Sequence, residues 1–454
     1  MAHSPFFDFL FRWKHALALY FEPRVMVILL LGFSSGLPLA LTVGTLALWL
    51  AELGVSKTSI ALFALAGTPY TFKFLWSPLV DRMPIYYLTR RLGQRRGWAV
   101  LTQLALMVFI VTLGASDPVR DPYWTGILTF AVAFWSATQD IVIDAYRVES
   151  LEERLYGHGA AVSVLGYRLG MLMSGAGVLY LATFWGWFVA YAIMAALMSV
   201  GLITILWNPE PERQTSMASR KQEIFMQAFL AARPGCAGWK GAVLAWISGA
   251  VIAPFAEFMG RRGWALTLLF ILMYKFGDAL AGVMSGPFYV EMGFSKIEIA
   301  NVTKLFGLGA VLLGGLAGGI LTERLGIMRA LWYCGVLQMV SNLMFVLLAW
   351  MGHSMEMLIV TIALENIAGG MGTSAFVAYL SRLCNVAYTA TQYALLSSFM
   401  AFGRTLLASS GGWLADHVSW ATFFLLTTLA AIPGLLLWWW MGRWFPEGVF
   451  NASK

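Results

Sequence analysis

The chain has 454 residues, of which 59% are hydrophobic and 12% are charged, whereas charged residues make up about a quarter of a typical soluble domain. This composition excludes a water-soluble globule and predicts a protein that has membrane lipid as its surroundings. The net charge of +7 does not indicate a nucleic-acid partner, because basic residues beside membrane spans are retained on the cytoplasmic side. The three cysteines, Cys236, Cys334 and Cys384, have no motif spacing, so neither disulfides nor a metal site are expected.

Long apolar runs, bounded by charged residues and by Gly or Pro, recur along the chain. Each is about 20 residues long, which suits an α-helix that crosses a bilayer, and none has the two-residue alternation of a barrel strand. We therefore expect an all-α membrane protein with 12 transmembrane helices. The runs cover residues 25–51, 58–80, 97–115, 124–146, 159–183, 186–207, 263–290, 297–322, 327–351, 355–382, 388–414 and 419–442.

A polar stretch between the sixth and seventh runs divides the chain into halves. The predicted parts are an N-terminus over 1–24, a six-helix bundle over 25–207, a central linker over 208–262, a second six-helix bundle over 263–442 and a tail over 443–454. No signal-cleavage pattern precedes the first run, so we expect that helix to remain in the protein. Within the linker, residues 241–258 are apolar but short and contain Pro254 and Glu257, which favours an interfacial helix over a span.

Three features of the first half recur in the second, in the same chain order. They are the hexapeptides Glu52–Lys57 and Glu291–Lys296, the pairs Asp81-Arg82 and Glu323-Arg324, and Arg168 with Gly175 against Arg404 with Gly411. The members of each pair lie 236 to 242 residues apart, which is hard to obtain by chance. Two pseudo-symmetric bundles related by an axis along the membrane normal form the major facilitator fold, with a substrate site between them near the midplane. We expect that fold here.

The basic residues predict which way the chain crosses the membrane. With a cytoplasmic N-terminus, twenty-two Lys and Arg residues fall inside and only Lys57, Arg120 and Lys296 fall outside. By the positive-inside rule, both termini are expected in the cytoplasm.

Several stretches of the sequence resemble the AmpG family of muropeptide permeases, which are major facilitator proteins. They are LGFSSGLPLALTVGTL (31–46), FKFLWSPLVDR (72–82), SATQDIVIDAY (136–146), AAVSVLGYRLGMLMSG (160–175), MYKFGDA (273–279), LENIAGGMGTSAFVA (364–378) and TQYALLSSFMAFGR (391–404). The resemblance extends over nearly the whole chain, from about residue 25 to 440, and includes charged positions within the expected spans.

This resemblance implies a proton-coupled permease that imports GlcNAc-1,6-anhydro-MurNAc peptides across the inner membrane of a Gram-negative bacterium by alternating access. Its implied partners are muropeptide and protons, it needs no cofactor, and we expect a monomer. One alternative is transport of another anionic solute such as an acyl-CoA, because the neighbouring families include acetyl-CoA transporters. An intramembrane enzyme is the other alternative, but no nucleophile–base constellation or metal cluster is apparent, so no catalytic or metal-binding residues are expected.

Ionisable residues within the spans are functional candidates, because each costs about 2.5–3.5 kcal/mol to insert. The cations can bind the free carboxylates of a peptide stem, and nearby aromatic rings can pack on sugars. The expected substrate-binding residues are Lys73, Tyr70, Tyr167, Arg168, Lys275, Lys304 and Arg404. Structural ion pairing is the alternative, as between Lys275 and Asp278, which share one helix face.

The intramembrane carboxylates are the expected proton carriers: Asp140, Asp144, Asp278 and Glu365. Asp140 and Asp144 lie one helical turn apart, so their mutual repulsion favours a proton on one of them. Glu365 lies in an apolar stretch, where desolvation disfavours its charged form. The alternative for Asp144 is a structural partner of Arg147.

Two acidic-basic pairs at cytoplasmic span ends are expected to act in gating, as surface ion pairs. They are Asp81 with Arg82 and Glu323 with Arg324. The glycines at positions 32, 36, 369, 370 and 372 are expected to allow close packing between helices.

Overall fold

The computed structural model describes residues 17–53, 63, 65–211, 253–385, 388–408 and 410–444, and within these ranges all regular structure is helical. The helices of the first half are α2 (Pro23–Ala40), α3 (Leu46–Glu52), α5 (Thr68–Phe72), α6 (Ser77–Arg82), α7 (Tyr86–Leu92), α8 (Gln94–Gly114), α9 (Pro122–Ser150), α10 (Tyr156–Leu172), α11 (Val178–Leu197) and α12 (Ser199–Trp207). Short π-helical segments, Leu41–Thr45 and Met173–Gly177, continue α2 and α10 without a turn in the chain.

The second half begins with a short helix before its first membrane-crossing segment. Its helices are α15 (Ala253–Met259), α16 (Trp264–Tyr274), α17 (Phe276–Glu291), α18 (Lys296–Ile299), α19 (Gly307–Leu325), α20 (Ile327–Met351), α21 (Met355–Leu383), α22 (Thr389–Ala408), α23 (Ser410–His417), α24 (Trp420–Ala430) and α25 (Ile432–Trp444). A π-helical segment, Ala300–Phe306, joins α18 to α19.

These helices follow the expected apolar runs. Among the described residues, nine helical stretches are long and apolar enough to cross a membrane. One of them, Glu153–Trp207, contains the fifth and sixth runs together. The chain leaves helical geometry between these two runs at Gly186, with φ of +79°. The second run includes residues outside the description, between positions 54 and 64.

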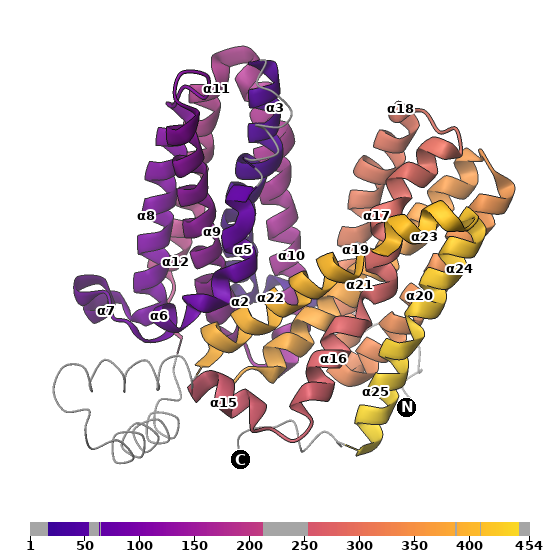
Figure 1. The fold of residues 1–454 in the computed structure, drawn as a ribbon. Coiled ribbons are helices and arrows are strands. Elements are labelled where there is room, and N and C mark those ends of the chain that lie inside the picture. Colours follow the sequence, from indigo (N-terminus) through magenta and orange to yellow (C-terminus); the bar gives the residue numbers. More distant parts are fainter. Residues whose placement is uncertain are drawn as a thin grey trace, which may run out of the picture.

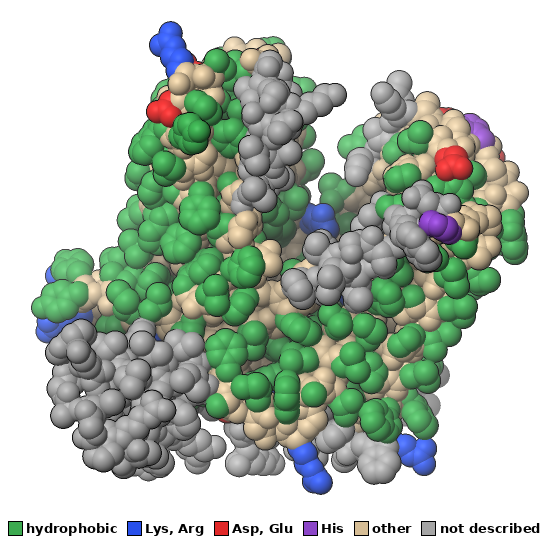
Figure 2. Space-filling view, viewed as in Figure 1, with side chains coloured by type: hydrophobic (Ala, Val, Ile, Leu, Met, Phe, Trp, Pro, Cys, Tyr) green, Lys and Arg blue, Asp and Glu red, His purple; other side chains and the backbone are tan. Residues whose placement is uncertain are grey.

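The two halves form two bundles arranged as a V (Figure 1). They diverge where α3, α11 and α18 lie, which we call the open end, and meet at the opposite, closed end. Figure 2 shows a cleft between the bundles at the open end, with hydrophobic side chains over the outer surface of both. Exposed apolar surface of this extent is typical of contact with lipid rather than water.

Residues near both ends of the described chain pack on the second bundle, one against α19 and one at the start of α20. Tyr20 donates a hydrogen bond to Leu316 O, and Trp438 Nε1 donates to Met328 O. Residues 212–252 of the expected linker lie outside the described part, which leaves 241–252 of the expected interfacial helix without a description and 253–259 in α15. The division into domains therefore stays a prediction.

Glycines bring helix backbones together within each bundle. A Cβ atom on Gly36 of α2 would lie 2.1 Å from Tyr167 O of α10, and one on Gly370 of α21 would lie 2.2 Å from Val311 O of α19. Gly369 differs from the expectation of close packing, because a Cβ atom there would meet no described atom within 4 Å. Gly370 therefore faces the packed helix α19, whereas its neighbour Gly369 faces open space.

We expect Gly370→Ala to destabilise the protein by roughly 1–3 kcal/mol, since the new methyl group meets rigid backbone. The matched control is Gly369→Ala, which adds the same methyl group one residue away in open space. Thermal unfolding of the detergent-solubilised variants checks this. Equal unfolding midpoints for the two variants would contradict the assigned packing.

Candidate functional site

At the closed end, the carboxylate of Asp81 in the first bundle caps the first turn of α22 in the second. It accepts hydrogen bonds from Thr391 N at 2.7 Å, Thr391 Oγ1 at 2.6 Å and Ala390 N at 3.3 Å. The first amides of a helix lack acceptors within the helix and carry partial positive charge, so a carboxylate is stabilising there. A buried side chain thus joins the bundles.

Arg95, in the first turn of α8, holds Asp81 in place. Its Nη2 atom lies 2.6 Å from both Asp81 Oδ1 and Glu149 Oε1, and all three side chains are at most 3% exposed. Burial alone would raise the pKa of Asp81, but the charge of Arg95 and the donors of α22 outweigh it and hold the pKa below its ordinary value. The guanidinium of Arg82 lies over the ring of Tyr388 instead, 4.9 Å from its centre. Asp81 is therefore buried and not at the surface as expected, and the gating role of Asp81 and Arg82 stays a prediction.

Further polar contacts between the bundles surround this capping interaction. Arg147 Nη1 donates to Ser381 Oγ at 2.9 Å, Arg382 Nε lies 3.1 Å from Glu153 Oε1, and Tyr20 donates to Leu316 O at 2.5 Å. Glu323 and Arg324 occupy the last turn of α19, where both side chains are half-buried. The closed end is sealed by these contacts together with packed apolar side chains from both bundles.

In the first bundle, Lys73 lies where a spanning helix is interrupted. Helix α5 ends at Phe72, and a single 3₁₀ turn, Lys73–Leu75, precedes α6. Lys73 Nζ lies 3.9 Å from Asp144 Oδ2. One turn away on α9, Asp140 Oδ1 accepts a hydrogen bond from Ser35 Oγ of α2 at 2.5 Å. The structure therefore brings Lys73 and both aspartates together, and it adds Ser35.

Tyr70 and Tyr167 lie beside this cluster, within reach of the charge of Asp140. Arg168 lies on another face of α10. Gly157 of the same helix packs against α19 of the second bundle. Arg168 lies 11 residues after Gly157, which is about three helical turns, so the two residues share one side of α10. The side chain of Arg168 is exposed, so it lies toward the second bundle beyond the point of contact.

The second bundle repeats the arrangement of a lysine at a helix break. Lys275 separates α16 from α17, with φ of −104°, and its Nζ atom lies 3.4 Å from Asp278 Oδ2 and 3.4 Å from Thr373 Oγ1. Gln338 Nε2 of α20 also donates to Asp278 Oδ2. The ion pair suggested by the spacing is therefore present, supported by two polar residues that the sequence did not single out.

Glu365 lies on the face of α21 that carries Thr373, two turns away. Its Oε2 atom accepts a hydrogen bond from Asn366 Nδ2 at 2.8 Å. Between Glu365 and Thr373 lies Gly369, which leaves open space beside the helix backbone. Open space flanked by a carboxylate, a lysine and hydrogen-bonding groups can receive a polar solute.

Lys304 and Arg404 occupy the π-helical segment before α19 and the body of α22, and their side chains lie outside the described part of the structure. The missed partners Ser35, Gln338 and Thr373 are polar residues within apolar runs. Intramembrane polarity was the signal that could have found them, but the sequence does not show which charge each one meets.

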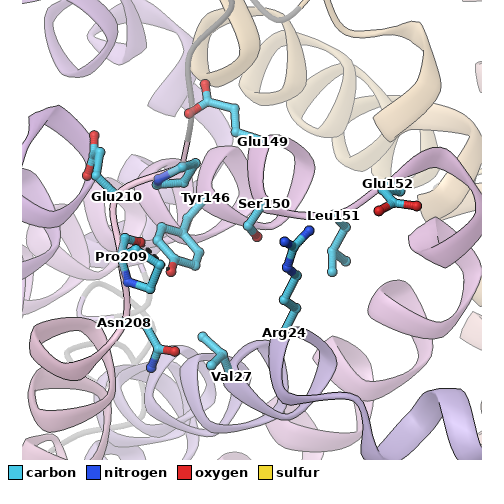
Figure 3. Close-up of a pocket in the computed structure, with 11 residues that line it drawn as sticks. Arg24, Val27, Tyr146, Glu149, Ser150, Leu151, Glu152, Asn208, Pro209 and Glu210 are labelled. Carbon is cyan, nitrogen blue, oxygen red and sulfur yellow. Dashed lines mark hydrogen bonds between the residues drawn. The ribbon is translucent and has the colours of Figure 1, made fainter.

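A separate pocket lies within the first bundle, near the closed end (Figure 3). Its volume is about 390 Å³, and its lining residues come from α2, from the end of α9 and from residues 208–211. Arg24 points into it, and Tyr146 donates to Pro209 O at 3.0 Å across its wall. Its described lining residues all belong to the first half of the chain.

Comparison with protein families matches both halves to membrane transporters. Residues 24–203 match the family described as acetyl-coenzyme A transporter 1, and residues 266–450 match the major facilitator superfamily. The chain is 41% identical over 423 residues to the anhydromuropeptide permease of Escherichia coli K12, across 93% of this chain and 80% of that protein. It is 36% identical to the transporter AmpG 4 of Rickettsia felis, across 91% and 95% of the two chains.

Solved structures show the same fold. The proton:xylose symporter XylE superposes with a TM-score of 0.64 at 13% identity, over 93% of this chain and 95% of that one. The Escherichia coli fucose:proton symporter FucP gives 0.64 at 11% identity, over 92% and 98%. At these identities the likeness extends to the fold alone.

We expect Asp81→Asn to lower the thermal midpoint of the purified protein strongly, because it leaves Arg95 short of one buried partner and α22 without its anionic cap. Breaking a buried pair costs about 3–5 kcal/mol. The control is Asp117→Asn, whose partner Arg120 lies 3.4 Å away with both side chains exposed, a pair worth about 0–1 kcal/mol. Similar shifts in both variants would contradict the role given to Asp81.

Proposed function

The chain belongs to the AmpG family of muropeptide permeases in the major facilitator superfamily, and from this premise we propose that it imports anhydromuropeptides by proton-coupled alternating access. The observation that carries the proposal is the cleft between the bundles, with a lysine at a helix break on each side. Lys73 and Lys275 are suited to the carboxylates of a peptide stem. The resemblance of 93% of the chain to an anhydromuropeptide permease supports this substrate.

We place the closed end in the cytoplasm, because basic residues gather there. They are Arg82, Arg90, Arg91, Arg95, Arg96, Arg147, Arg154, Arg261, Arg262, Arg324, Arg329 and Arg382. Both termini then lie in the cytoplasm of a bacterium, the membrane is the inner one, and the cleft opens to the periplasm. The structure thus corresponds to the state that receives substrate from outside.

Substrate binding falls to the cations and aromatic rings near the cleft. We assign carboxylate binding to Lys73, Arg168, Lys275, Lys304 and Arg404, and sugar packing to Tyr70 and Tyr167. Since both bundles belong to one chain, a monomer contains the complete cleft. No further subunit is needed to form it.

Proton coupling falls to Asp140, Asp144, Asp278 and Glu365. Neighbouring cations compensate some of these carboxylates: Lys73 for Asp144, and Lys275 for Asp278. Among the described residues, the hydrogen-bond partners of Asp140 and Glu365 are neutral groups, Ser35 and Asn366. A desolvated carboxylate with neutral partners is the better proton carrier.

A second candidate is transport of an acyl-CoA. The match of residues 24–203 to the acetyl-coenzyme A transporter model favours it, and the same cations can bind phosphates.

Uptake of labelled muropeptide into proteoliposomes tests the proposal. We expect accumulation driven by an inward proton gradient, abolished by a protonophore and indifferent to sodium. Acetyl-CoA supplied in excess should not compete. Sodium-dependent uptake that survives the protonophore would contradict proton coupling. If the protein takes up acetyl-CoA but no muropeptide, the proposed substrate is wrong and the acyl-CoA candidate takes its place.

Replacing two of these carboxylates with neutral amides should separate substrate binding from proton coupling. Glu365→Gln and Asp140→Asn mimic the protonated state, so we expect both to keep substrate exchange across the membrane and to lose uphill accumulation. Thermal midpoints measured alongside show whether the variants are folded. Unimpaired uphill uptake in both would remove these residues from the coupling mechanism.

A further inference from the structure

The two carboxylate oxygens of Asp144 contact two different cations, Lys73 beside the cleft and Arg147 toward the closed end. Its Oδ2 atom lies 3.9 Å from Nζ of Lys73, and its Oδ1 atom lies 3.2 Å from Nη2 of Arg147. Lys73 belongs to the interrupted helix beside the cleft, whereas Arg147 lies nearly one turn closer to the closed end on α9 itself. One charge is therefore shared by two cations with different surroundings.

Arg147 also binds the second bundle. Its Nη1 atom donates to Ser381 Oγ of α21 at 2.9 Å, and its guanidinium lies 5.0 Å from the ring centre of Tyr393 in α22. The side chain is only 1% exposed. Its Nε atom is buried and has no hydrogen-bond partner among the described residues. The guanidinium of Arg147 thus contacts both bundles and still has one N–H group, at Nε, without an acceptor among the described residues.

We propose that Asp144 transmits occupation of Lys73 to the closed end. The inference rests on the proposed function, because it needs an anionic solute in the cleft. A substrate carboxylate that binds Lys73 takes over the charge of that lysine, and Asp144 then turns fully to Arg147. By accepting from the free Nε–H as well as Nη2–H, Asp144 draws the guanidinium away from Ser381 and Tyr393.

Substrate binding at Lys73 is expected to favour opening of the closed end, because the contacts of Arg147 differ in whether they survive separation of the bundles. Asp144 and Arg147 lie three residues apart on one helix, so their ion pair persists when the closed end opens. The contacts of Arg147 with Ser381 and Tyr393 cross between bundles and are lost. Any change that strengthens the first at the cost of the second favours opening, and the Asp81 cap on α22 opposes it.

A cysteine at position 394 reports on opening. Ala394 is 1% exposed and packs with residues of the first bundle at the closed end. Ala394→Cys, in the full chain with Cys236, Cys334 and Cys384 replaced by Ala, is labelled in nanodiscs by a polar maleimide. A GlcNAc-anhydro-MurNAc tripeptide should raise the labelling rate about tenfold, the size expected when one charge-assisted hydrogen bond is redistributed. Equilibrium binding of the same tripeptide is measured in parallel.

Asp144→Asn should bind the tripeptide yet lose most of this increase, leaving less than about a twofold change. Because it leaves two cations without their carboxylate, a second variant is needed if the protein unfolds. Arg147→Lys keeps the charge but lacks the fork that reaches Asp144 and Ser381 together, so it should label fast without substrate and respond little to it.

The control is Glu153→Gln, which breaks the ion pair with Arg382 between the bundles at 3.1 Å without touching Lys73 or Asp144. It should keep the substrate-dependent increase. A full increase in both Asp144→Asn and Arg147→Lys would overturn the role of Asp144. Failure of the parent protein to bind the tripeptide would instead contradict the proposed substrate, so the two failures are distinguishable.

Discussion

The closed end depends on the burial of Asp81 between two positive partners, the Arg95 guanidinium and the first amides of α22. A carboxylate removed from water is stable only when its charge is compensated nearby, and here Arg95 of its own bundle and the amides of the opposite bundle both contribute. The bundles therefore cannot separate at this end without exposing or stranding a charge. At the open end no described contact of this kind joins them, which is why the V opens there.

Interruptions in the spanning helices place cations beside the cleft. A regular helix of apolar residues presents no free donor or acceptor to a solute, because its backbone groups bond to one another. At Lys73 and Lys275 the helix geometry is broken, and each lysine is held by an aspartate of its own bundle. Each ammonium has three donors, so a lysine held by an aspartate in this way keeps donors for a further acceptor, as Lys275 does toward Thr373.

The two bundles repeat in backbone but not in chemistry. Both carry a lysine at a break, yet the first adds two aspartates one turn apart and the second adds Glu365 beside Gly369. The two bundles therefore differ in the charged and hydrogen-bonding groups beside their helix breaks.

The sequence by itself determined the spanning helices, the two similar halves and the set of intramembrane charges, because hydropathy and repeat spacing are properties of local stretches of chain. Only the tertiary structure decided which charges meet. Asp81 was expected beside Arg82, its neighbour in sequence, but it bonds to Thr391 and Arg95, since a buried carboxylate takes the best donors that folding brings near. Likewise Gly369 and Gly370 are adjacent and were both expected to pack closely, and only the position of α19 shows that Gly370 packs against backbone while Gly369 faces open space.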